Sequence, residues 1–155
     1  MTSMPHAQDR STLVTPPVWV HRVSLAVGIS GLAIGLWTFF EPASFYADFP
    51  VSGAAWVSRL GHYNEHLTVD FGSAQIGLAI AAIVVSISRS AWGSVAVLGG
   101  FLVFGVLHFS YHLGTFDAFS PGSAAAQAVA LATFLVLPAA ALVGIYTSQR
   151  KGTRT

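Results

Sequence analysis

Four long apolar stretches limit what this chain can fold into. They run from about Trp19 to Phe40, from about Glu65 to Ile87, from about Trp92 to Tyr111 and from about Ala124 to Tyr146. A helix needs about 20 mostly apolar residues to cross the hydrocarbon core of a bilayer, and each stretch is long enough. We therefore predict an all-α protein, an integral membrane antiparallel four-helix bundle whose main partner is the lipid bilayer.

The composition excludes several classes of protein. Hydrophobic residues make up 54% of the chain and charged residues only 8%, whereas an ordinary soluble domain carries about 25% charged residues. A formal net charge of +1 gives no basic surface for nucleic acid. Because cysteine is absent, disulfides, iron–sulfur clusters and thiolate metal sites are excluded, and any bound metal needs nitrogen and oxygen ligands.

The basic residues predict how the chain lies in the membrane. An even number of spans places both termini on one side, and that side then carries Arg10, Arg22, Arg89, Arg150, Lys151 and Arg154. Only Arg59 lies opposite, so the positive-inside rule makes this side cytoplasmic. We expect a multi-pass protein of the cell membrane with a disordered cytoplasmic tail (1–17), a four-helix transmembrane domain (18–148) and a basic cytoplasmic tail (149–155).

The outer loop between the first two spans, about Glu41 to Asn64, is too apolar to lie free in water. Its apolar side chains are Phe45, Tyr46, Phe49, Trp56, Val57 and Leu60. We predict a short interfacial helix, with Pro50 near its start, that folds over the outer mouth of the bundle and caps it.

Glycines in the first span predict close helix packing. Gly31 and Gly35 form a G-x-x-x-G pattern that Gly28 extends. This spacing lets two helix backbones approach each other. We expect it to serve packing within the bundle rather than a dedicated dimer face.

Ionisable residues gather at the outer ends of the second and third spans. On one helix face lie His62, Glu65, His66 and Asp70, and on the third span His108 and His112 stack one turn apart with Tyr111 beside them. The second span begins on the outer side and the third ends there, so both groups lie at one level on helices that we expect to be neighbours. Such groups are costly inside a membrane and usually mark a site or pathway.

The chemistry of this set favours a metal site. Imidazoles and carboxylates bind divalent transition metals such as Zn²⁺, Fe²⁺ and Cu²⁺. The predicted ligands are Glu65, His66, Asp70, His108 and His112, with His62 as a further candidate. Asp70 would ligate or orient a ligand histidine, and Tyr111 would be the catalytic proton donor. Haem with one axial histidine from each span is an alternative.

Structural interpretations compete with the metal site. His62 can be a hydrated loop residue, and Glu65 a first-turn carboxylate beside Asn64 as the helix cap. Asp70 and one histidine can form a buried hydrogen-bonded strut. The segment from His62 to His66 also fits the H-x-x-E-H string of inverzincin peptidases, but so short a string recurs by chance.

These segments carry a resemblance to a known family. Tyr63-Asn64-Glu65-His66 with Asp70-Phe71-Gly72, and His108-Phe109-Ser110-Tyr111-His112, are similar to segments of a family of short four-helix membrane proteins of actinobacteria. The outer-loop segment Phe45–Pro50 is similar as well, so the resemblance covers about Trp37 to Pro138. The family has a loose likeness to DoxX-type membrane proteins, which are associated with quinone-linked redox chemistry. The resemblance implies one functional unit at Glu65, His66, Asp70, His108 and His112.

Two functional hypotheses follow. The first is a metal-dependent oxidoreductase that acts on a quinone or another lipid-soluble substrate at the outer bilayer boundary. The second is a non-enzymatic membrane subunit, in a homo- or hetero-oligomer, or a transporter of a small solute or metal. Because the third span is apolar from Val95 to Leu107, the sequence favours a site open to one side over a pore.

Overall fold

The structure, a computed structural model, describes residues 15–152, and these fold into helices without strands. Four helices are long and apolar enough to cross a membrane: α1 (Val18–Phe40), α3 (Glu65–Ser88), α4 (Ala91–Leu113) and α5 (Pro121–Gly152). A short helix, α2 (Pro42–Asp48), follows α1, and a 3₁₀ turn, η1 (Phe116–Ala118), follows α4. The predicted all-α fold with four spans is confirmed. Residues 1–14 of the predicted N-terminal tail and residues 153–155 lie outside the described residues.

Side-chain caps mark the starts of α3 and α4. Asn64 caps α3 as expected, because its Oδ1 accepts a hydrogen bond from the Leu67 backbone N–H (3.1 Å). Ser90 caps α4 in the same way through the Gly93 N–H (3.0 Å). At the C-terminus α5 continues to Gly152, beyond the expected end at Tyr146. The Arg150 guanidinium lies over the Tyr146 ring one turn earlier, 5.0 Å from its centroid, which supports this extension.

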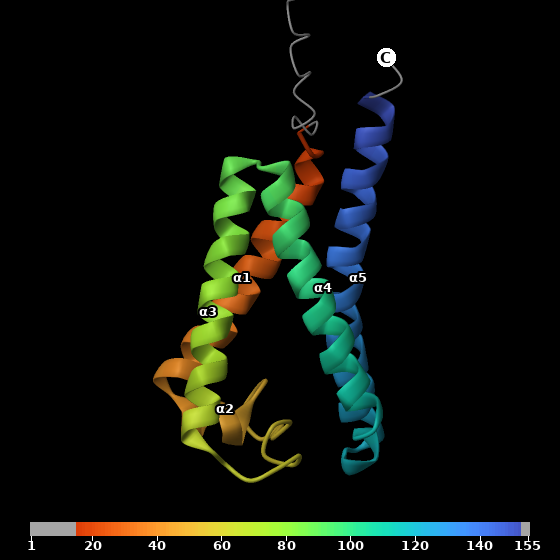
Figure 1. Cartoon of the computed structure of the whole chain (residues 1–155). Helices are drawn as coiled ribbons and strands as arrows, with labels where there is room; N and C mark the ends of the chain where they lie inside the picture. Colours follow the sequence, from red (N-terminus) through yellow and green to blue (C-terminus); the bar gives the residue numbers. More distant parts are fainter. Residues whose placement is uncertain (1–14, 153–155) are drawn as a thin grey trace, which may run out of the picture.

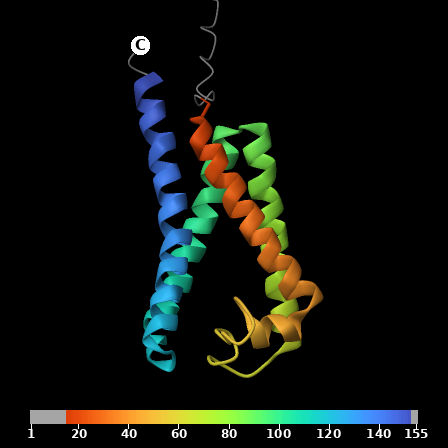
Figure 2. The ribbon, with the colours of Figure 1, turned by 180° about the vertical axis from the view of Figure 1, so that it is seen from behind.

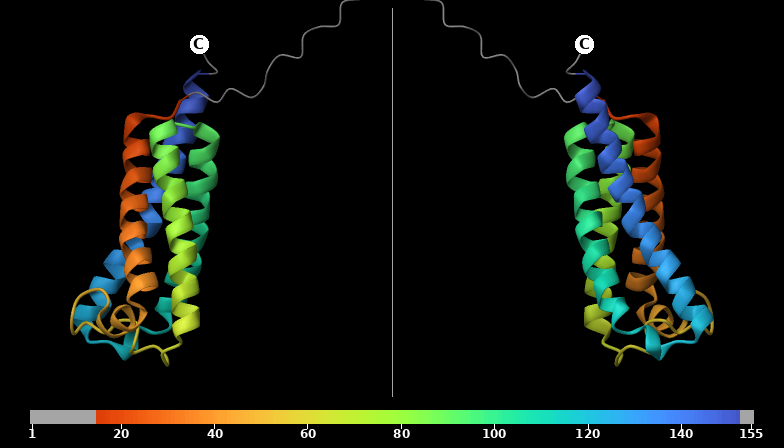
Figure 3. Two further views of the ribbon diagram at one scale, coloured as in Figure 1. Left: turned by 90° about the vertical axis from the view of Figure 1, so that its left-hand side faces the viewer. Right: turned by 90° about the vertical axis from the view of Figure 1, so that its right-hand side faces the viewer.

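The long helices form two pairs that diverge. α1 packs chiefly against α3, and α4 chiefly against α5. The pairs meet at the narrow end, which holds the start of α1, the α3–α4 turn and the end of α5, and they separate toward the wide end, which holds α2 (Figures 1 and 2). Viewed from the side, α1, α3 and α4 run nearly side by side, α5 runs obliquely across them, and α2 with its following loop lies at the lower end (Figure 3).

Apolar side chains form two buried clusters toward the narrow end. Buried there are Val20, Leu98, Ala141 and Ile145, and a second buried cluster comprises Val27, Ala82 and Phe101. These residues come from both helix pairs. The narrow end is therefore a packed core, and it holds the pairs together where they meet.

Small residues bring α1 and α3 into close contact. A Cβ atom on Gly72 would lie 2.8 Å from the Phe39 backbone N and 3.1 Å from the Gly35 carbonyl oxygen. A Cβ atom on Gly28 or on Gly35 would likewise lie very close to atoms of α3. The G-x-x-x-G pattern of α1 thus serves packing within the bundle, as predicted.

The chain caps the wide end, but not with the helix that we predicted. The expected helix with Pro50 near its start is wrong: the helix is α2, which begins at Pro42 and ends before Pro50. Pro42 occupies the first turn, where its missing N–H costs nothing. The following cap segment, residues 49–64, forms turns without a helix. Tyr46 Oη donates a hydrogen bond to the Gly61 carbonyl oxygen (2.6 Å), which holds the cap segment against α2.

Candidate functional site

A cavity of about 570 Å³ lies between the two helix pairs at the wide end. All four long helices, α2 and the cap segment contribute to its wall. Most of the wall is apolar, formed by Ile34, Phe45, Phe49, Trp56, Val57, Leu60, Leu67, Phe71, Phe104, Ala130, Leu131 and Phe134. Among the described residues that line it, none is Asp, Glu, Lys or Arg. The size is typical of small-molecule sites, and the wall suits an uncharged, mainly apolar ligand.

Aromatic residues of α2 and the cap segment close the cavity on one side. The Phe45 and Phe49 rings lie 4.8 Å apart, and the Phe49 and Trp56 rings 6.2 Å apart. Trp56 Nε1 donates a hydrogen bond to Ser123 Oγ at the start of α5 (2.8 Å). The cap segment, which leads into α3, thereby also contacts the α4–α5 pair.

His108 and His112 stand together on the α4 part of the wall. Their ring centroids are 4.7 Å apart, and the His108 ring stacks on Phe104 at 5.2 Å. Both histidines are partly buried because their one-turn spacing turns them to the same side of α4. Tyr111, the predicted proton donor, also lines the cavity, although its side chain is 57% exposed.

The most unusual group on the wall is the side chain of Gln127 on α5. Gln127 is 1% exposed, and within residues 15–152 neither its amide nitrogen nor its amide oxygen has a hydrogen-bond partner. His112 Nδ1 is also buried without a partner there. The two side chains lie close enough to interact, but no hydrogen bond of ordinary geometry joins them. A buried unpaired polar group is costly, and on a cavity wall it indicates a place where a ligand can supply the hydrogen bonds.

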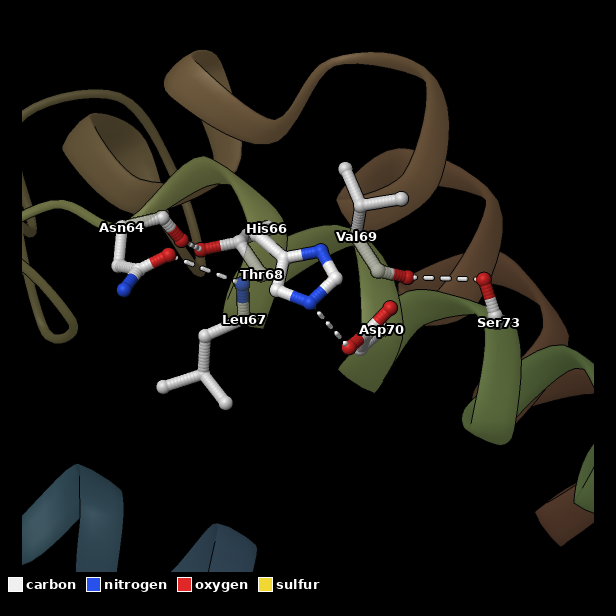
Figure 4. Close-up of polar contacts among 7 residues, drawn as sticks. All are labelled: Asn64, His66, Leu67, Thr68, Val69, Asp70 and Ser73. Atoms are coloured by element: carbon white, nitrogen blue, oxygen red, sulfur yellow. Dashed lines mark hydrogen bonds and ion pairs between the residues drawn. The ribbon is translucent and has the colours of Figure 1, made fainter.

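The predicted ligands on α3 lie elsewhere. His66 Nε2 is 3.3 Å from Asp70 Oδ2, and the two side chains are 88% and 60% exposed (Figure 4). Glu65 is exposed too, and none of the three lines the cavity. His62 precedes α3 and does line the cavity, as an exposed residue.

Helix geometry explains why Glu65, His66 and Asp70 lie away from the cavity. The cavity-lining stripe of α3 comprises Leu67, Thr68, Phe71 and Gln75. His66 precedes its first residue by one position, a turn of about 100° around the helix. The start of α3 and the end of α4 also lie in different helix pairs at the end where the pairs separate (Figure 1). Consequently the described part of the chain contains no group of three or more His, Asp or Glu that could hold a metal ion.

Among the described residues outside the spans, Tyr63 has a shifted pKa. Its ring packs against Tyr46 at 5.2 Å. Partial desolvation, and secondly the negative charge of Glu65, raise the pKa of the Tyr63 phenol above its usual value. Tyr63, like an ordinary tyrosine, is neutral at neutral pH and adds no charge to the cap segment.

Sequence reasoning missed Gln127. The available signal was its amide, the only one in the apolar stretch from Ala124 to Tyr146, because strongly polar side chains in membrane helices often mark sites. No protein-family model, curated protein or solved structure matches this chain. The resemblance to an actinobacterial membrane family therefore stays a prediction, and the cavity is the feature of the structure that bears on function.

Proposed function

We propose that this protein binds an uncharged, lipid-soluble small molecule in the cavity at the wide end, and that the ligand is a quinone. The observation that carries the proposal is the buried, unpaired amide of Gln127 on an apolar wall. A quinone combines an apolar ring with carbonyl oxygens that accept hydrogen bonds. The amide N–H₂ of Gln127 can donate to one carbonyl oxygen, and a ring N–H of His112 can donate to the same edge of the ligand.

The surroundings support a bound ligand over a transported one. The residues of the packed clusters around Leu98 and Phe101 do not line the cavity, so the cavity does not extend to the narrow end. A site that does not run through the bundle suits a molecule that enters from the bilayer or its boundary. The alternative of a non-enzymatic subunit uses the same cavity as a binding site without turnover.

Binding of 1,4-naphthoquinone to the full chain in lipid nanodiscs tests the proposal. The probe forms no thiol adducts with this protein because the chain has no cysteine. By equilibrium dialysis we expect saturable binding beyond that of empty nanodiscs. Gln127→Leu keeps the size of the side chain but removes its donors, and we expect about a tenfold loss of affinity, the effect of one buried hydrogen bond.

Stability provides a second measurement on the same variant. Removing an unpaired buried amide is expected to raise the free energy of unfolding by about 1–3 kcal/mol in the absence of ligand. Thr133→Val, on α5 but outside the cavity wall, is the matched control and should change neither property. Wild-type protein without saturable binding, or a Gln127→Leu variant that binds normally and unfolds more easily, would contradict the proposal.

A further inference from the structure

A second buried amide lines the cavity from the opposite helix pair. Gln75 on α3 is 8% exposed and belongs to the cavity wall. Its Nε2 atom lies 3.7 Å from the position that a Cβ on Gly31 would occupy, so the absence of a side chain at Gly31 leaves room for the amide against α1. Like Gln127, Gln75 is a strongly polar side chain in a span that is otherwise mostly apolar. Burying such a group is costly unless it forms hydrogen bonds, and polar groups in spans often mark sites.

The two glutamines lie on opposite pairs and at different depths. Gln127 is six residues from the first residue of α5, or about 9 Å along the axis, and Gln75 is ten residues from the first residue of α3, or about 15 Å. The helices that carry them diverge toward the wide end (Figure 1). An amide at each position can donate and accept hydrogen bonds, and apolar side chains make up most of the wall around them.

We infer that the cavity selects a ligand with two hydrogen-bonding groups on opposite edges of an apolar body, one bound by Gln127 on α5 and the other by Gln75 on α3. This inference rests on the proposed function and narrows the class of ligand. A 1,4-quinone meets the requirement because its carbonyl oxygens point in opposite directions. A 1,2-quinone does not, because both of its oxygens lie on one edge and can reach only one of the two glutamines.

The isomers 1,4- and 1,2-naphthoquinone test this inference, since they have the same composition and nearly the same size. With the full chain in nanodiscs, we expect the 1,4-isomer to bind on the order of fivefold more tightly, as one additional hydrogen bond would give. Gln75→Leu should lower the affinity for the 1,4-isomer to that for the 1,2-isomer and leave the 1,2-isomer unaffected. Ser73→Ala is the matched control, because Ser73 is exposed on α3 and bonds to the Val69 carbonyl of its own helix (Figure 4).

The outcomes separate this inference from the proposed function. If Gln127→Leu weakens binding but Gln75→Leu leaves the ratio of the two affinities unchanged, the inference is wrong and the proposed function stands. If neither isomer binds wild-type protein saturably, both fail. Gln75→Met, which is unbranched like glutamine, replaces Gln75→Leu if the leucine variant is not helical and monodisperse, and the same results are then expected.

Discussion

His66 and His108 have the same spacing to a second polar group, but their surroundings differ. His66 faces Asp70 one turn away at an exposed surface, where an ion pair contributes about 0–1 kcal/mol to stability. His108 is partly buried between Phe104 and His112 on the cavity wall. The i, i+4 spacing therefore does not distinguish a binding site from a hydrated surface. The side of the helix on which the pair lies makes that distinction.

Metal binding remains a prediction, and we propose His108 and His112 on the cavity wall as its ligands. Two imidazoles one turn apart can bind one Zn²⁺ or Cu²⁺, with solvent or the bound ligand completing the coordination. In calorimetric titration with Cu²⁺ we expect His108→Ala to abolish saturable uptake and His66→Ala to leave it unchanged. Loss of uptake in His66→Ala alone would place the metal on the exposed side of α3, and wild-type protein without uptake would refute the prediction.

At the scale of the helices, the α1–α3 contact depends on glycines that lie directly against backbone atoms of the neighbouring helix. The carbonyl oxygen of Gly35 and the backbone of Phe39 lie against Gly72, so a side chain there would meet backbone atoms that cannot move independently. Gly77 lies on the same helix, and a Cβ atom added there would meet open space. The two glycines thus differ in packing while sharing helix, residue type and apolar surroundings.

Gly72→Ala should separate α1 from α3. We expect it to lower the free energy of unfolding by about 1–3 kcal/mol, the usual cost of overpacking, measured by thermal unfolding in detergent. Gly77→Ala is the control and should be neutral or slightly stabilising, because alanine has the higher helix propensity. Equal effects of the two substitutions would show that the α1–α3 contact does not depend on the close approach at Gly72.

At the scale of the whole molecule, the sequence predicts the spans well and their arrangement poorly. Length and apolarity identify a membrane helix without reference to its neighbours, and a cap such as Asn64 acts locally. The direction in which a helix face points cannot be predicted in the same way. Lipid and protein interior are both apolar, so no polar stripe marks the outside of the helix. Hence the shared face of Glu65, His66 and Asp70 could be predicted, but not that it lies away from the cavity. His108, His112, Tyr111 and His62 lie at the wide end and line the cavity, and their roles as ligands or proton donor stay predictions.

The same global view yields a prediction about orientation. The start of α1, the α3–α4 turn and the end of α5 share the narrow end (Figure 1), and these segments carry Arg22, Arg89, Arg150 and Lys151. The cap segment at the wide end carries Arg59 alone. Since the side with more Lys and Arg stays in the cytoplasm, we predict that the wide end, with the cavity, faces away from the cytoplasm.

Single cysteines can test this orientation against an otherwise cysteine-free chain. Ser52→Cys places a thiol in the cap segment, and Ser88→Cys places one at the end of α3; both positions are exposed. In intact cells, a membrane-impermeant maleimide should label Ser52→Cys and leave Ser88→Cys unlabelled until the membrane is opened. Labelling after lysis shows that both thiols can react. The reverse pattern in intact cells would put the cavity at the cytoplasmic side, and its ligand would then have to enter from the inner half of the bilayer.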